Sequence, residues 1–312
     1  MLACEERVPG AEVPGDECAC WVRGAGCGVQ NIRRAAVAGS WYPGSASALS
    51  AAVDRHLAAT SRDLDGDLVA LIAPHAGLMY SGPVAAHAYR LLRGRMFDRI
   101  VLVGPSHFVA FEGVSIVADG GFESPYGVAP IDATCARAML AASPVIREHP
   151  PAHVREHSLE MQLPFVQRLA PGAPIVPLVM GHQTSATAHA LGDALARVLR
   201  GTRTLLVAST DLSHYHEAGT AAAMDRVVID CVSRFDPDGL QAVLHAEPDH
   251  ACGGGPTVAV MRAARELGAR AGVVLDYADS GDVSGDKSSV VGYLAAAFGT
   301  FHDGEAPRTG NG

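Results

Sequence analysis

The sequence predicts an α/β protein with a mostly parallel central sheet that is covered by helices on both faces. Short runs of Val, Ile and Leu recur along the chain, and amphipathic stretches lie between many of them. Near-continuous apolar strands that alternate with helices are typical of a parallel sheet buried on both faces. The 312 residues are 48% hydrophobic but only 5% aromatic, with 34 Gly and 19 Pro, which favours Ala/Val/Leu packing and short loops.

The individual elements follow from apolar runs bounded by turn residues. The expected strands are Leu68–Ile72, Ile100–Val103, Val114–Val117, Ile175–Val179, Leu205–Ala208, Val273–Tyr277 and Val290–Leu294. The expected helices are Val84–Leu92, Thr134–Ala142, Thr184–Leu199, Ala221–Arg234 and Pro256–Leu267. Pro256 is expected in a first helical turn, where proline is favoured.

We expect one domain from residue 34 to residue 302, because no internal repeat or long linker divides this stretch. Residues 303–312 are predicted to form a flexible tail. Residues 1–33 are predicted to be a poorly ordered extension that contains four cysteines, namely Cys4, Cys18, Cys20 and Cys27. Their spacing, with one C-x-C and no C-x-x-C, is poor for zinc, so an extension without fixed structure is favoured over a small metal or redox site.

Charge and hydropathy exclude two classes of partner. The chain has 24 basic and 33 acidic residues and a net charge of -9, without the basic face that a nucleic-acid binder needs. It also has no apolar run that approaches the roughly 18–20 residues of a membrane span and no recognisable signal peptide. We therefore expect a cytoplasmic protein that keeps its cysteines reduced and binds neither nucleic acid nor membrane.

Histidines follow three of the expected strands. His75 comes after the first, His107 after the second, and His214 after the strand Leu205–Ala208. Ligands of open α/β sheets bind at the carboxyl ends of the strands, so these imidazoles are expected at the edge where a site forms. Imidazole serves there in metal coordination or in proton transfer near neutral pH.

Two histidines and one anionic group suit Fe(II). Asp211 is one candidate for the third ligand, and it could instead orient His214. Cys252 is the other, since a thiolate beside a helix N-terminus is stabilised by the helix dipole. His157 and Glu160, at the start of another expected helix, either cap that helix or support the ligands in the same cleft.

Several catalytic motifs are absent. The sequence contains no H-E-x-x-H, no G-x-S-x-G and no G-x-G-x-x-G. Residues 281–288 resemble a P-loop superficially, but the spacing from Gly to Gly-Lys is wrong for one. Zincin, α/β-hydrolase and dinucleotide-binding chemistry are therefore not expected.

An ordered series of motifs resembles the Memo family, whose bacterial members are also called AmmeMemoRadiSam system protein B. The resemblance extends from about Ala35 to Thr300, nearly the whole expected domain. The segments that carry it are Gly39–Tyr42, Ala73–Gly77, Gly104–His107, Glu156–Met161, Ser209–His214, Cys252–Gly253 and Ser288–Tyr293.

The resemblance implies a fold like that of class III extradiol ring-cleavage dioxygenases, in which two His and a Glu hold Fe(II). In Memo proteins the matching pocket has two His and a Cys, proposed to bind iron or copper. His75, His107 and Cys252 match these ligands, and His214 matches the acid/base histidine, with Asp211 beside it. The thiolate in place of a carboxylate departs from the dioxygenases, so the resemblance does not extend to ring cleavage. A second departure is local: the Memo family often has a basic or His residue soon after the Cys, whereas this sequence has Gly253–Gly255.

Three functions remain open at this stage. The first is a metal-dependent redox protein, with an oxidoreductase or dioxygenase-like activity if it is an enzyme, linked to a radical-SAM protein and an AMMECR-type protein. The second is a non-catalytic interaction protein whose vestigial pocket binds a peptide, a small aromatic ligand or a partner. The third is a metal-dependent hydrolase that uses His214 and His216 as an H-x-H pair.

Overall fold

A nine-stranded mixed sheet forms the centre of the molecule. The computed structural model describes residues 21–23 and 31–302, so Cys4, Cys18, Cys20, Cys27 and the expected tail 303–312 lie outside the described residues. The main path of the sheet runs in the order β11 (His214–His216), β13 (Val290–Phe301), β3 (Gly66–Ala73), β10 (Thr204–Ser209), β4 (Arg99–Pro105), β9 (Ile175–Met180), β5 (Val114–Ile116) and β8 (Ile146–Glu148). The remaining strand, β12 (Ala271–Asp279), pairs with β13.

The four central strands, β3, β10, β4 and β9, pair in parallel, as the sequence predicts. All six residues of β9 and of β10 are buried, because helices cover both faces. The α/β class is thereby confirmed. The flanks differ, since β13 pairs antiparallel with both β3 and β12, and β5 pairs antiparallel with β9. Only a short connection joins β12 to β13, too short for the crossover that parallel pairing requires.

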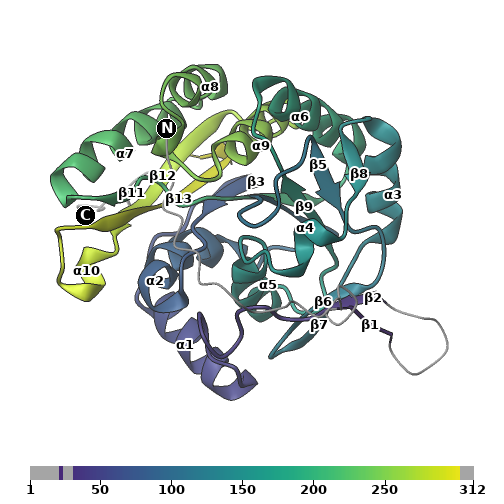
Figure 1. The fold of residues 1–312 in the computed structure, drawn as a ribbon, viewed down its shortest axis with the longest axis horizontal. Helices are drawn as coiled ribbons and strands as arrows, with labels where there is room; N and C mark the ends of the chain where they lie inside the picture. Colours follow the sequence, from purple (N-terminus) through teal and green to yellow (C-terminus); the bar gives the residue numbers. More distant parts are fainter. Residues whose placement is uncertain (1–20, 24–30, 303–312) are drawn as a thin grey trace, which may run out of the picture.

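Helices lie on both sides of the sheet (Figure 1). One side carries α1 (Ala46–Ala58), α2 (Leu78–Tyr89) and α5 (Leu163–Leu169), and the other carries α6 (Ser185–Leu199), α7 (Ala218–Ser233), α8 (Pro237–Ala246) and α9 (Gly254–Glu266). The shorter or peripheral elements are α3 (Ala133–Ala142), α4 (Pro151–Val154), α10 (Gly281–Ser284), η1 (Arg90–Leu92), η2 (Glu160–Gln162) and η3 (Pro248–His250).

All seven expected strands and all five expected helices are present, with shifted ends. The helix expected from Val84 begins earlier, at Leu78, and continues through Pro83. Helices α1 and α8 were not expected. Each begins at a polar capping residue, Ser45 and Asp236, whose side chain accepts a backbone N–H of the first turn.

A second, four-stranded sheet joins β1 (Trp21–Arg23), β2 (Asn31–Arg33), β6 (Gly121–Ser124) and β7 (Gly127–Pro130). Residues Asn31–Arg33, which the sequence assigns to the extension, pair in parallel with β6. The Arg33 side chain is fully buried and forms an ion pair with Glu160. The paired structure thus begins at least three residues before the boundary expected from composition.

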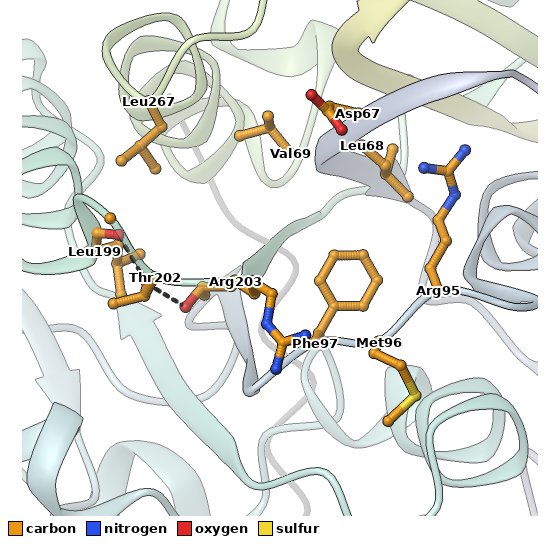
Figure 2. A pocket seen from close by; sticks show the side chains of 12 residues that line it. Asp67, Leu68, Val69, Arg95, Met96, Phe97, Leu199, Thr202, Arg203 and Leu267 are labelled. Atoms are coloured by element: carbon orange, nitrogen blue, oxygen red, sulfur yellow. Dashed lines mark hydrogen bonds between the residues drawn. The ribbon is translucent and has the colours of Figure 1, made fainter.

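A cavity of about 330 Å³ lies at the amino ends of β3 and β10, at the opposite end of the strands from the histidines (Figure 2). The two arginines that line it already form hydrogen bonds within the protein. Arg95 donates to the carbonyl oxygens of Leu64 and Gly66, and Arg203 pairs with Asp98. Within the described ranges, no helix combines the length and the apolar character needed to cross a membrane.

Candidate metal centre

The structure brings His75, His107 and Cys252 together at the carboxyl edge of the sheet. One ligand atom from each of the three lies within 4.8 Å of the others. His75 Nε2 is 3.3 Å from Cys252 Sγ, and the rings of His75 and His107 meet edge to face with centroids 5.2 Å apart. These are the three residues that the family resemblance assigns as metal ligands.

The parallel core explains why the two histidines meet. His75 follows β3 and His107 follows β4, and both strands pair in parallel with β10 between them. Their carboxyl ends therefore lie at one edge of the sheet. Both histidines lie in turns that contain proline and glycine. Pro74 and Gly77 flank His75 after β3, and Gly104 and Pro105 precede His107 at the end of β4.

Cys252 reaches this edge from the segment that precedes α9. The neighbouring Gly253 donates its N–H to Thr210 Oγ1 at 2.9 Å. A Cβ at Gly253 would lie 2.4 Å from the Ser209 carbonyl oxygen, so the close approach of the two backbones requires glycine. The Asp211 N–H in turn donates to Cys252 Sγ at 3.3 Å.

Asp211 lies beside the cluster, where it accepts a hydrogen bond from the backbone of His75. Its Oδ1 receives the His75 N–H at 2.7 Å, and its Oδ2 is 4.0 Å from His75 Nε2. Burial raises the pKa of the Asp211 carboxyl, although the His75 N–H opposes this shift. Asp211 thus positions the His75 turn, a role that the sequence did not suggest.

His214 lies on β11, next to the cluster but outside it. Its Nδ1 is 2.7 Å from the carbonyl oxygen of Leu212, to which it donates. The strand is irregular, because Tyr215 has a φ of 62° and the pairing with β13 shifts between His214 and His216. On a regular strand the side chains of an H-x-H pair point to the same face, and this irregularity breaks that alternation for His214 and His216.

Glu156 is the functional residue that sequence reasoning missed. Its Oε1 accepts His107 Nδ1 at 2.9 Å, and its Oε2 accepts the His107 backbone N–H at 2.6 Å. Burial raises the pKa of the Glu156 carboxyl, but the hydrogen bonds and charge of His107 outweigh it and hold the pKa at about 2. The only signal was its place in the motif segment Glu156–Met161, which spacing alone could not connect to His107.

The two residues expected to support the ligands behave differently. The His157 ring stacks on His107 with centroids 4.6 Å apart and contacts Trp41 at 4.4 Å. Burial lowers the pKa of His157 to about 4. Glu160 accepts instead from Arg33, from the Val37 N–H and from the Tyr42 hydroxyl, so it anchors the segment after β2.

The charge states of the metal-free cluster follow from burial. Desolvation, reinforced by the neighbouring His107, lowers the pKa of His75 to about 3, so His75 is neutral at physiological pH. Desolvation and the nearby Asp211 raise the pKa of Cys252 well above its ordinary value. The cluster without metal is thus a thiol beside neutral imidazole, and coordination has to displace the thiol proton.

This donor set fits a transition-metal ion. The nitrogen and sulfur ligand atoms of a tetrahedral ion lie about 3.4–3.6 Å apart, so metal binding would draw these three atoms, now within 4.8 Å of one another, closer together. Donation from His107 Nδ1 to Glu156 leaves Nε2 for a metal, the usual carboxylate–histidine–metal arrangement. A thiolate with two imidazoles favours iron, copper or zinc over magnesium or calcium.

A cleft of about 760 Å³ has Cys252 in its lining, but neither His75 nor His107. It runs between the starts of α6 and α9 and is lined by Gln183, Gln241 and Leu244 together with Cys252. Gln183 forms part of its wall, since its Nε2 donates to the Cys252 carbonyl oxygen at 2.6 Å.

Comparisons with known proteins agree with this architecture. A family model described as Memo-like protein matches residues 33–297. The chain is similar to a MEMO1 family protein of Methanothermobacter thermautotrophicus, with 39% identity over 272 residues that cover 84% of this chain and 98% of the relative. A MEMO1 family protein of Nitrosopumilus maritimus is 33% identical over 273 residues, covering 86% and 99%.

One solved structure has a similar fold. The crystal structure of the uncharacterized protein JW3007 from Escherichia coli K12 superimposes with a TM-score of 0.52 over 75% of this chain and 100% of that one. The sequence identity is 15%, so this likeness concerns the fold alone.

Proposed function

Because the chain belongs to the Memo family, we propose that it is a redox metalloprotein in which His75, His107 and Cys252 hold one iron or copper ion. The observation that carries the proposal is the convergence of two imidazoles and one thiol within 4.8 Å at the carboxyl edge of the sheet. The bound ion would supply one-electron redox chemistry and polarise an oxygen-containing ligand.

The protein's own groups prepare this site. His75 offers a neutral nitrogen, and Glu156 orients His107 through two hydrogen bonds. Cys252 loses its proton on coordination. We assign to His214, on β11, the transfer of protons to and from the bound ligand.

Metal analysis of protein purified without oxygen tests the proposal. We expect close to one iron or copper per chain in the wild type and a large loss in His75→Ala and Cys252→Ser. Cys231→Ser is the matched control, because Cys231 is a buried cysteine on α7. Retention of the metal by both site variants would overturn the assignment.

One observation favours the second candidate function, a pocket that binds a ligand without turnover. Trp41 and Phe108, which are 39% and 49% exposed, both contact the His157 ring. Exposed aromatic side chains around a ring that stacks on His107 suit a small aromatic ligand or a peptide. Assays of oxygen consumption and of ligand binding across a panel of catechols separate the two candidate functions. A pocket without turnover should consume no oxygen, and its affinity for the ligand should fall in Trp41→Ala.

The proposal also includes a cellular setting. A reducing cytoplasm would keep Cys252 a thiol that is free to bind metal. The radical-SAM protein and the AMMECR-type protein are the proposed partners, on the ground of the family resemblance. Co-expression of the three chains, followed by purification of a complex that survives gel filtration, tests this part of the proposal.

A further inference from the structure

A buried chain of hydrogen bonds leads away from His75 on the side opposite Cys252. His75 Nδ1 is 2.9 Å from Ser209 Oγ. Ser209 Oγ is also 2.8 Å from Gln162 Nε2, and Gln162 Oε1 accepts from the Tyr89 hydroxyl at 2.8 Å. Ser209, Gln162 and Tyr89 are all fully buried, so the chain is shielded from water.

The direction of each hydrogen bond can be derived from its partners. The Ser158 carbonyl oxygen, 2.7 Å from Ser209 Oγ, can only accept, so it takes the single hydroxyl proton of Ser209. The Pro74 carbonyl oxygen, 3.1 Å from Gln162 Nε2, can also only accept, which fixes the orientation of the Gln162 amide. The second N–H of that amide then donates to Ser209 Oγ.

Because its only proton is donated to the Ser158 carbonyl oxygen, Ser209 Oγ can only accept a hydrogen bond from His75. If His75 Nδ1 were the acceptor, the Ser209 proton would have to leave the Ser158 carbonyl oxygen, which would lose this partner in a buried site. The arrangement that satisfies every group has the proton of His75 on Nδ1. The lone pair is then on Nε2, which is 3.3 Å from Cys252 Sγ.

We propose that Ser209 and Gln162 are positioning residues that set the tautomer of His75, so that the Nε2 lone pair faces the metal position before any ion binds. The inference deepens the proposed function, since it concerns the same site, but the tautomer itself is a property of the metal-free protein. It also gives the two histidine ligands different supports, the neutral Ser209 for His75 and the charged Glu156 for His107.

The tautomer can be measured without any metal. In metal-free, full-length protein labelled with ¹⁵N-histidine, long-range ¹H–¹⁵N correlation distinguishes a protonated Nδ1 from a protonated Nε2. The His75 signals are assigned by their loss in His75→Asn. We expect the proton on Nδ1, and a His75 ring protonated on Nε2 would overturn the inference.

Metal titration provides the second readout. Ser209→Ala should give a mixture of the two His75 tautomers and weaken anaerobic Fe²⁺ binding by about 10- to 100-fold, the usual cost of losing a group that orients a ligand. Ser115→Ala is the matched control, because Ser115 is a buried serine whose Oγ is 2.9 Å from the remote His153. An unchanged tautomer and affinity in Ser209→Ala would also overturn the inference.

The two proposals fail in different ways. If the wild type holds the Nδ1 tautomer but binds neither iron nor copper, the proposed function fails and the assignment of Ser209 and Gln162 stands. If the metal-free wild type carries the His75 proton on Nε2 but still binds iron or copper, the assignment of Ser209 and Gln162 fails and the proposed function stands. Should Ser209→Ala not fold, the wild-type spectrum still decides the inference.

Discussion

The carboxylate of Glu156 holds His107 at two points, the backbone N–H at 2.6 Å and the ring Nδ1 at 2.9 Å. One side chain therefore fixes both the position of the turn after β4 and the rotation of the imidazole. Because Glu156 is 3% exposed, water cannot replace either hydrogen bond. Glu156 is the group on which the geometry of His107 depends most directly.

Glu156→Gln should weaken metal binding while the fold is kept. The amide has nearly the same shape but no charge, and its NH₂ group cannot accept from His107. We expect an affinity for Fe²⁺ about 10- to 100-fold lower, as for other groups that orient metal ligands. Calorimetric titration without oxygen measures the change, with the exposed Glu148→Gln as control. Equal affinities in the two variants would contradict this role for Glu156.

A second prediction concerns pH and His153, which is buried away from the three ligands. Desolvation, together with the charge of Arg33, lowers the pKa of His153 to about 3 in the folded protein, against 6.5 ordinarily. Between these values the unfolded state binds a proton that the folded state does not. Stability therefore falls as the pH drops below 6.5, by at most about 1.4 kcal/mol per pH unit from this residue.

His153→Gln removes this contribution and should flatten the dependence of the unfolding free energy on pH between 7 and 5. Urea unfolding at several pH values measures the slope. His75 and His157 have depressed pKa values too and contribute to the slope in the same direction, so the variant should reduce the slope but not abolish it. The exposed His182→Gln is the control, and a slope in His153→Gln as steep as in wild type would refute the prediction.

A third prediction concerns the buried ion pair of Arg33 and Glu160, both fully buried. Glu160→Ala leaves the Arg33 guanidinium without its carboxylate, which should destabilise the fold by about 3–5 kcal/mol. The double variant Arg33→Met/Glu160→Leu should be less destabilised than Glu160→Ala, because no buried charge remains. Chemical denaturation of both variants checks the order, and the opposite order would show that the pair itself carries the stability.

The sequence was sufficient to place His75 and His107 at one edge of the sheet, because each follows a buried apolar strand and parallel strands end at a common edge. It was not sufficient for Glu156, which is 49 residues from His107 and acts on it only through the fold. Asp211 was assigned to the right neighbourhood with two possible roles, whereas its contact is with the His75 backbone. Such contacts depend on the distance between loops in the folded protein. The periodicity of apolar residues along the sequence gives no information on that distance.

Strand direction shows the same limit. Apolar runs predicted the strands, but a run that is buried on both faces looks the same whether its neighbour is parallel or antiparallel. The pairing of β12 with β13 depends on the short connection between them. Arg33 illustrates a further limit, because a single arginine gives no indication in the sequence that its partner Glu160 lies 127 residues away.

The last prediction concerns Gly253, which brings Cys252 against the end of β10. A methyl group there would lie 2.4 Å from the Ser209 carbonyl oxygen and 2.7 Å from Thr210 Cβ, so backbone has to move. Gly253→Ala should cost about 1–3 kcal/mol of stability, as overpacking does, and should displace Cys252 enough to lower the Fe²⁺ affinity. Gly77→Ala is the matched control two residues from His75, where the new methyl group meets nothing nearer than 3.6 Å. Chemical denaturation and anaerobic metal titration of both variants separate the effects. If Gly253→Ala loses stability but binds Fe²⁺ as tightly as Gly77→Ala, the position of Cys252 does not depend on this close approach.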